Sequence, residues 1–190
     1  MRIVATLLTL SFPCALFAQE NGFEYTYVDA ALLNTEIEVG TTDVDGDGIG
    51  VSGSFAISDS LNILVGYSDQ SYDFNIDGST MNVGLGFHTD INNDLDFVAD
   101  VSYIDVSVDT PFGSADDDGL GIGGGIRFRA SDSLELDAGL QYVDLDDSDT
   151  VLNLGGRYYF NDSFALSAGI SDADAGMSWS VGVRAHFGGN

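Results

Sequence analysis

The sequence predicts an all-β fold, a ten-stranded antiparallel up-and-down transmembrane β-barrel, and three observations lead to this prediction. From Asn21 to Phe187, apolar and polar residues alternate with period two, which is typical of half-buried strands. Clusters of Asp, Asn, Ser and Gly interrupt the alternation at regular intervals, as turns do. Beyond the N-terminal segment, no stretch approaches the roughly 18 consecutive apolar residues that a membrane helix needs, so a helical membrane protein is excluded.

The first residues predict a signal peptide. One positive charge at Arg2 precedes an apolar segment that is too short to span a bilayer as a stable helix, and the small Ala18 then precedes polar residues. We expect residues 1–18 to be the signal peptide, cleaved after Ala18, and residues 19–190 to form one outer-membrane β-barrel domain.

Composition excludes several classes of function. Cys14 is the only cysteine, and because it lies in the predicted signal peptide, the exported domain has no disulfide, thiolate metal site or cysteine nucleophile. Thirty-one Asp and Glu residues oppose five basic residues and give a net charge of −26. This charge opposes binding to nucleic acid or to a bare anionic surface, which makes cations the natural partners.

The turn signals divide the chain into ten expected strands. We expect them at 23–36, 47–57, 61–71, 79–88, 95–107, 119–130, 134–144, 150–160, 164–171 and 177–187. The turns after the even-numbered strands are short and alike, such as Ser58-Asp59-Ser60, whereas those after the odd-numbered strands are more acidic and mostly longer. An outer-membrane barrel has this inequality, with tight periplasmic turns, longer external loops and both termini in the periplasm.

The two faces of each strand differ in polarity. The apolar face, which we assign to lipid, carries in the sixth strand Leu120, Ile122, Ile126 and Phe128. The opposite face is small or polar and suits a narrow lumen, as in Gly121, Gly123, Gly125, Arg127 and Arg129. The alternation is blurred in the first strand, so Tyr25 and Tyr27 could face either way.

A soluble β-sandwich also has one apolar face on each strand, and three features favour the barrel. The polar face is rich in Gly and Ser, which are poor residues for a solvated strand but fit the crowded interior of a small barrel. Aromatic residues lie at both ends of the apolar bands, as interfacial girdles do. Three strands end in a Tyr-x-Asp step that marks a lipid boundary, at Tyr67, Tyr103 and Tyr142.

Four short segments carry a resemblance to a known family. They are 25–29 (YTYVD), 45–48 (DGDG), 66–68 (GYS) and the last strand, 179–187 (WSVGVRAHF). Together the chain resembles the small outer-membrane β-barrel proteins of proteobacteria, of the OmpX and OmpA barrel type, over nearly all of its mature length. The resemblance implies an outer-membrane location and supplies no reaction. It also implies that Phe187 is the aromatic signal for the barrel-assembly machinery, although three more residues follow it.

The inward face holds a candidate ion-pair network. All four arginines of the predicted exported domain fall on it, near the periplasmic turns: Arg127, Arg129, Arg157 and Arg184. Inward acids lie at the same level on neighbouring strands: Asp96, Asp100, Glu135 and Asp137. We expect these charges to pair across strands and plug the lumen, with Asp29 as a further member, because buried charges are costly unless satisfied. The alternative is a gated or leaky path for ions.

One acidic segment fits the first half of an EF-hand calcium loop, in which alternate carboxylates wrap the ion and the sixth residue is Gly. Its candidate metal ligands are Asp43, Asp45 and Asp47. The twelfth position is Ser54, where a calcium hand has Glu, so a solvated hairpin loop is the alternative. Because lipopolysaccharide is anionic, we also expect Ca²⁺ or Mg²⁺ to bridge the acidic external loops to its phosphates.

The sequence favours a non-enzymatic barrel. Both histidines, His88 and His186, lie beside periplasmic turns, whereas an outer-membrane protease or acyltransferase needs a histidine near the external rim. We therefore predict a structural barrel that is embedded in outer-membrane lipid and lipopolysaccharide. We expect its acidic loops to bind divalent cations or surface partners. Two alternatives stay open, namely a narrow pore for small cationic solutes and an adhesin or signalling protein.

Overall fold

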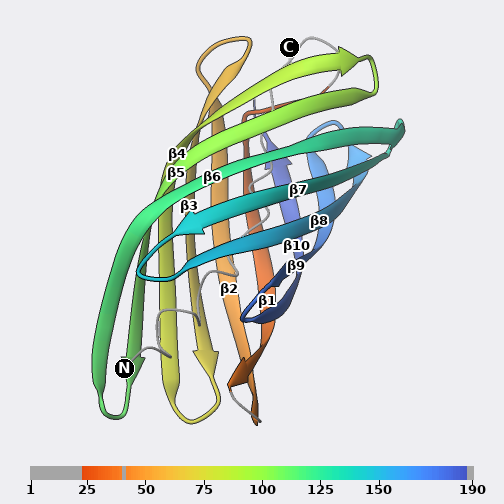
Figure 1. The fold of residues 1–190 in the computed structure, drawn as a ribbon. Helices are drawn as coiled ribbons and strands as arrows, with labels where there is room; N and C mark the ends of the chain where they lie inside the picture. The colour runs from red at the N-terminus through yellow and green to blue at the C-terminus, as the bar shows by residue number, and fades with distance from the viewer. Residues whose placement is uncertain (1–22, 40–41, 188–190) are drawn as a thin grey trace.

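The computed structural model describes residues 23–39 and 42–187, which form ten antiparallel strands closed into one barrel (Figure 1). The strands are β1 (Tyr27–Val39), β2 (Thr42–Ala56), β3 (Leu61–Tyr72), β4 (Ile76–Asn92), β5 (Leu95–Thr110), β6 (Gly113–Ser131), β7 (Leu134–Asp144), β8 (Ser148–Asn161), β9 (Phe164–Ala173) and β10 (Gly176–His186). Each strand pairs with its neighbours in the sequence, and β1 pairs with β10, so the sheet has no free edge. The predicted fold class is confirmed.

Two predictions about the N-terminal part have different outcomes. The predicted signal peptide, residues 1–18, lies outside the described residues. Tyr25 and Tyr27, whose direction the sequence left open, both face the lumen, with 1% and 2% of their surface exposed. No helix in the described part of the chain is long and apolar enough to cross a membrane.

The barrel has two ends, which we call terminal and distal. The terminal end holds the start of β1 and the end of β10, and the distal end holds the β3–β4 and β5–β6 turns, which lie beside each other at the bottom of Figure 1. The expectation of long loops at the distal end is wrong, because the described turns at both ends contain only two to four residues. Strands β2, β4 and β6 begin at Thr42, Ile76 and Gly113, instead of at 47, 79 and 119.

The acidic segments that the sequence assigned to loops at the distal end form strands, because their inward residues still bury apolar surface. At the distal end the inward side chains form what we call the distal apolar cluster: Ile37, Val44, Tyr72, Ile104, Val106, Val108, Val143 and Ala175. The outward residues there also support the ladder, since Ser71 donates a 2.7 Å hydrogen bond to Asp77 and Ser107 donates one of 2.7 Å to Asp116. The strands therefore continue toward the distal end, past the apolar band of the outward face that is described next.

The outward face between the two ends is an apolar band. Its large side chains are about half exposed, as in Ile122 at 61% and Trp179 at 50%. So continuous an apolar surface is suited to lipid, not to water. Tyr67, Tyr103 and Tyr142 border the band on the distal side, where all three are exposed.

Candidate functional site in the lumen

Three arginines pair with acids in the terminal half of the lumen, and we call these six residues the arginine layer. Arg127 Nε lies 2.7 Å from Glu135 Oε2, and its Nη2 contacts the same oxygen. Arg157 Nη1 lies 2.7 Å from Asp137 Oδ1. The third pair is bidentate, with Arg184 Nε and Nη2 at 2.7 Å and 2.6 Å from the two oxygens of Asp29. The structure thus brings together three of the four predicted arginines with three inward acids.

Two of these pairs are offset along the strands. In the register, Arg127 lies opposite Asp137 and Glu135 lies opposite Arg157, yet the ion pairs are Arg127–Glu135 and Arg157–Asp137. Each arginine therefore pairs with the acid that lies two residues away, along β7, from the acid opposite it in the register. The two offset pairs cross each other on β7, and they link β6 to β7 and β7 to β8.

The other two predicted acids have different surroundings. Asp96 lies opposite Arg127 in the register, but its Oδ2 accepts a 2.6 Å hydrogen bond from the hydroxyl of Tyr25. Asp100 lies opposite Gly123, and its Oδ1 is only 2.2 Å from where a Cβ atom of that glycine would lie. The glycine therefore gives the carboxylate its space.

Aromatic side chains at the start of the chain fill the space between the arginines, and the sequence did not predict their role. Phe23, Tyr25 and Tyr27, which we call the aromatic strip, are each at most 2% exposed. The Cζ atom of Arg127 lies 4.7 Å from the ring centroid of Phe23, and that of Arg184 lies 3.4 Å from Tyr27. Such stacking stabilises a desolvated guanidinium. The signal in the sequence is three aromatic residues at alternate positions in a barrel whose lumen holds several arginines.

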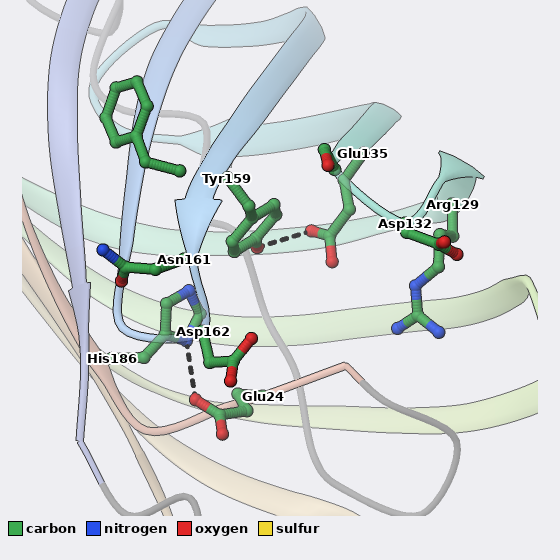
Figure 2. A pocket seen from close by; sticks show the side chains of 10 residues that line it. Glu24, Arg129, Asp132, Glu135, Tyr159, Asn161, Asp162 and His186 are labelled. Atoms are coloured by element: carbon green, nitrogen blue, oxygen red, sulfur yellow. Dashed lines mark hydrogen bonds and ion pairs between the residues drawn. The ribbon is translucent and has the colours of Figure 1, made fainter.

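The fourth predicted arginine lies outside the arginine layer. Arg129 stacks on Phe23, with its Cζ 4.3 Å from the ring centroid, and its side chain lines a pocket at the terminal mouth of the barrel. This mouth pocket has a volume of about 620 Å³, and Figure 2 shows its side chains. A much smaller cavity, of about 30 Å³, lies deeper in the barrel beside Arg157 and Arg184.

Acidic groups gather around the mouth pocket. Glu24, Asp132 and Asp162 line it, and Glu24 Oε2 lies 3.2 Å from Nδ1 of His186 (Figure 2). Burial raises the pKa of Glu24 above its ordinary value near 4.5, the charge of Asp162 raises it further, and Arg127 opposes the shift. Glu24 is therefore a partly buried carboxylate that lies near a second acid at the mouth.

The predicted metal ligands lie elsewhere and do not form a loop. Asp43, Asp45 and Asp47 lie in β2, exposed on its outward face. Alternate residues of one strand point in the same direction and cannot curl round an ion as an EF-hand loop does. Within residues 23–39 and 42–187, no group of three or more His, Cys, Asp or Glu side chains is arranged to hold a metal ion.

The predicted assembly signal lies at the terminal border of the apolar band. Phe187 follows the last residue of β10 and is 54% exposed. Its backbone N–H donates a 3.0 Å hydrogen bond to the carbonyl of Thr26. The ring therefore faces outward from a fixed backbone, and its recognition by the assembly machinery stays a prediction.

Comparison with known proteins gives one family and several distant structures. The model of the family described as outer membrane protein beta-barrel domain matches residues 4–190. The KdgM porin in complex with disordered oligogalacturonate is 14% identical over 85% of this chain and 99% of its own, with a TM-score of 0.48. Neisserial surface protein A is 17% identical over 85% and 96%, with a TM-score of 0.44.

A third structure is the attachment invasion locus protein Ail of Yersinia pestis. It is 12% identical over 85% of this chain and 97% of its own, with a TM-score of 0.45. A search of curated proteins found no match.

Proposed function

Because the chain belongs to the outer membrane protein β-barrel domain family, and so to the outer membrane, we propose that it is a non-enzymatic structural barrel with a closed lumen and an acidic external rim. In such barrels both termini lie in the periplasm. The terminal end then faces the periplasm and the distal end faces the outside. The filling of the lumen is the observation that carries this proposal.

The lumen is filled at two levels in series. Toward the periplasm, the arginine layer and the aromatic strip occupy the interior, and Arg127 and Arg184 are 0% and 1% exposed. Toward the outside, the distal apolar cluster contributes side chains such as Val106 and Val108, at 1% and 2% exposure. An ion would have to displace paired charges and then cross an apolar barrier, both of which are costly.

We expect the purified protein to give no steady single-channel conductance in a planar bilayer at neutral pH. Two barriers in series also predict that Tyr25→Ala, which opens space only in the periplasmic half, stays silent. A porin inserted in the same bilayers is the positive control. Regular cation-selective steps from the unmodified protein would contradict the closed barrel and support the alternative, a narrow pore for small cationic solutes.

The external rim places acids directly opposite one another on its outward face. Across neighbouring strands the register pairs are Glu36–Asp45, Asp77–Asp109 and Asp105–Asp118. Like charges directly opposite each other destabilise a sheet. We propose that Ca²⁺ or Mg²⁺ relieves this repulsion and bridges the rim to the phosphates of lipopolysaccharide. Asp43, Asp45 and Asp47 belong to this rim as an extended row of ligands, in place of a calcium loop.

Chelation of divalent ions is expected to lower the temperature at which the folded band is lost on a denaturing gel. The variant Asp105→Asn with Asp118→Asn removes one repelling pair. Chelation is therefore expected to lower the temperature at which its folded band is lost by less than in the unmodified protein. Outer-membrane vesicles with native lipopolysaccharide are the sample, and calcium repletion is the control. An identical fall in both proteins, or none in either, would be incompatible with cation bridging at the rim.

One observation favours the second candidate, an adhesin or signalling role. Phe74 and Phe112 lie in the β3–β4 and β5–β6 turns with 66% and 100% exposure. Asp77 pairs with Asp109, so the two turns project to similar heights on adjacent hairpins. Exposed aromatics at external tips have no role in holding the barrel together, whereas aromatic side chains often dominate binding interfaces.

For this second role we expect cells that carry Phe74→Ser with Phe112→Ser to bind to other cells or to a test surface several-fold less than cells with the unmodified protein. The matched control is Ile57→Ser, which changes a side chain of 56% exposure at the periplasmic end. Surface display is quantified in each case. Equal binding by the double variant and the unmodified protein would remove the support for an adhesive role.

A further inference from the structure

We propose that the distal end of the barrel binds a basic polypeptide segment that carries apolar side chains. The binding surface consists of Phe74 and Phe112 with the exposed acids Asp73, Asp77 and Asp109, and we call it the tip surface. This inference rests on the second candidate function, the adhesin or signalling role, and adds the chemical class of its partner.

Turn geometry and packing do not account for the two phenylalanines. Phe74 has a backbone φ of 66°, and the next residue, Asn75, has one of 57°. Both angles lie in the left-handed region, which Asn and Gly adopt more readily than a bulky residue. Phe112 is 100% exposed, so burial within the barrel does not explain it either. Aromatic rings that neither the turns nor the barrel need are available to a partner.

The backbone that carries each phenylalanine is held in place. The hydroxyl of Thr110 accepts a 3.2 Å hydrogen bond from the N–H of Phe112 and donates one of 2.8 Å to the carbonyl of Gly113. In the other turn, the N–H of Asp73 donates a 2.9 Å hydrogen bond to the carbonyl of Asp45 in β2. Binding to turns that are already ordered loses less conformational freedom than binding to a flexible loop.

The two rings project from adjacent hairpins, whose turns lie side by side at the bottom of Figure 1. Neighbouring strands are about 4.8 Å apart, so the centres of two adjacent hairpins are separated by about 10 Å. Side chains three positions apart on an extended polyproline II segment, which rises about 3.1 Å per residue, have nearly the same separation. One short peptide can therefore place an apolar side chain against each ring.

The charge of the distal end selects a basic partner. Asp77 and Asp109 lie opposite each other in the register, and both are exposed. The hydrogen bond to Asp77 comes from the hydroxyl of Ser71, at 2.7 Å. That to Asp109 comes from the hydroxyl of Ser114. These neutral donors leave the charges in place.

Basic residues of the chain itself do not neutralise this end. The sequence has no lysine, and the four arginines of the described residues all lie in the terminal half of the barrel. Nucleic acids and acidic polysaccharides would therefore be repelled, whereas lysine or arginine beside an apolar anchor would be attracted.

The experiment measures, by fluorescence anisotropy, how a labelled lysine peptide with two leucines three positions apart binds the full chain in phosphatidylcholine nanodiscs. This zwitterionic lipid does not attract the peptide by charge, and a chelator keeps divalent ions away from the rim. Empty nanodiscs give the background. Two control peptides separate the contributions, because serine in place of leucine keeps only the charge and glutamate in place of lysine keeps only the apolar anchors.

We expect saturable binding of the lysine–leucine peptide and a much lower affinity for both control peptides. Phe74→Ser with Phe112→Ser is expected to lower the affinity about tenfold or more, as the loss of aromatic anchors does at protein interfaces. Ile57→Ser, at the opposite end of the barrel, is expected to leave the affinity unchanged. Heat-modifiable migration on a denaturing gel checks that each variant is folded.

The acids are tested in the same assay. Asp77→Asn with Asp109→Asn is expected to lower the affinity several-fold and to weaken its dependence on salt between about 0.05 M and about 0.5 M. The matched control is Asp59→Asn with Asp132→Asn, which removes two acids from the terminal-end turns between β2 and β3 and between β6 and β7. This control is expected to bind as the unmodified protein does.

Three results would overturn the basic partner. They are the absence of saturable binding at about 1 mM peptide, equal binding of the glutamate peptide, and an equal loss of affinity in Asp59→Asn with Asp132→Asn, which would show a general charge effect. If the peptide did not bind while Phe74→Ser with Phe112→Ser still lowered cell binding, the adhesive role would stand with a partner of another class. The closed lumen does not depend on any of these results.

Discussion

Replacing Arg127 with Ala is expected to lower the free energy of unfolding by about 3–5 kcal/mol, the usual cost of removing one partner of a buried ion pair. Glu135, at 5% side-chain exposure, would keep its charge in the lumen without the guanidinium that now contacts it. The loss also removes one of the two guanidinium groups that stack on Phe23. Urea unfolding in lipid vesicles can follow the single tryptophan, Trp179, whose side chain leaves the lipid band on unfolding.

A double-variant cycle separates the pair from its surroundings. Arg127→Ala with Glu135→Ala is expected to cost less than the sum of the two single changes, because it leaves no lone charge behind. Arg129→Ala is the matched control, since Arg129 lines the mouth pocket and is less buried than Arg127. A loss of under about 1 kcal/mol in Arg127→Ala would mean that water already solvates this layer.

The second large effect on stability is expected at Gly125 in β6. The adjacent Gly124 faces the opposite side of the barrel wall and serves for comparison. Gly125 faces inward, and a Cβ atom there would lie 2.5 Å from the carbonyl oxygen of Ala138 and 2.8 Å from the Cα atom of Gly139. Gly125→Ala is therefore expected to force the strands apart at a cost of about 1–3 kcal/mol. Gly124→Ala is the matched control, since its nearest neighbour would be the carbonyl oxygen of Val98 at 3.8 Å.

The same vesicle-unfolding assay distinguishes the two glycine variants. Gly124→Ala is expected to match or slightly exceed the stability of the unmodified protein, because Ala restricts the unfolded chain more than Gly does. A larger loss in Gly124→Ala than in Gly125→Ala would show that the two faces have been assigned wrongly. The comparison thus tests which side of β6 faces the lumen.

The sequence was enough to predict the closed sheet, because period-two alternation and turn residues act locally on each strand. It also predicted that Arg127, Arg157 and Arg184 face inward. It could not predict the partner of each arginine. A long side chain can reach an acid two residues away from the one opposite it, so the strand register alone does not decide the pair. Asp96 illustrates this, since it lies opposite Arg127 but binds Tyr25.

Two other features could not be predicted from the sequence, for different reasons. The acidic stretches looked like loops because Asp and Gly favour turns, yet their inward residues, such as Val106 and Val108, continue the ladder into the distal apolar cluster. The mouth pocket combines residues from the N-terminal segment and the ends of distant strands. No local pattern of residues reports such a convergence.

The bidentate pair of Arg184 and Asp29 has a consequence for how the barrel is assembled. These residues are 155 positions apart in the chain, and they lie on the last and first strands. The seam between β10 and β1 can therefore close only after all ten strands exist, and its closure bears the largest loop entropy of the sheet. A slip of two residues at the seam would keep every side chain on its own face but would place Arg184 opposite Tyr27 or Ala31. The pair thus acts as a register mark for the final step of folding, when no later strand remains to correct an error.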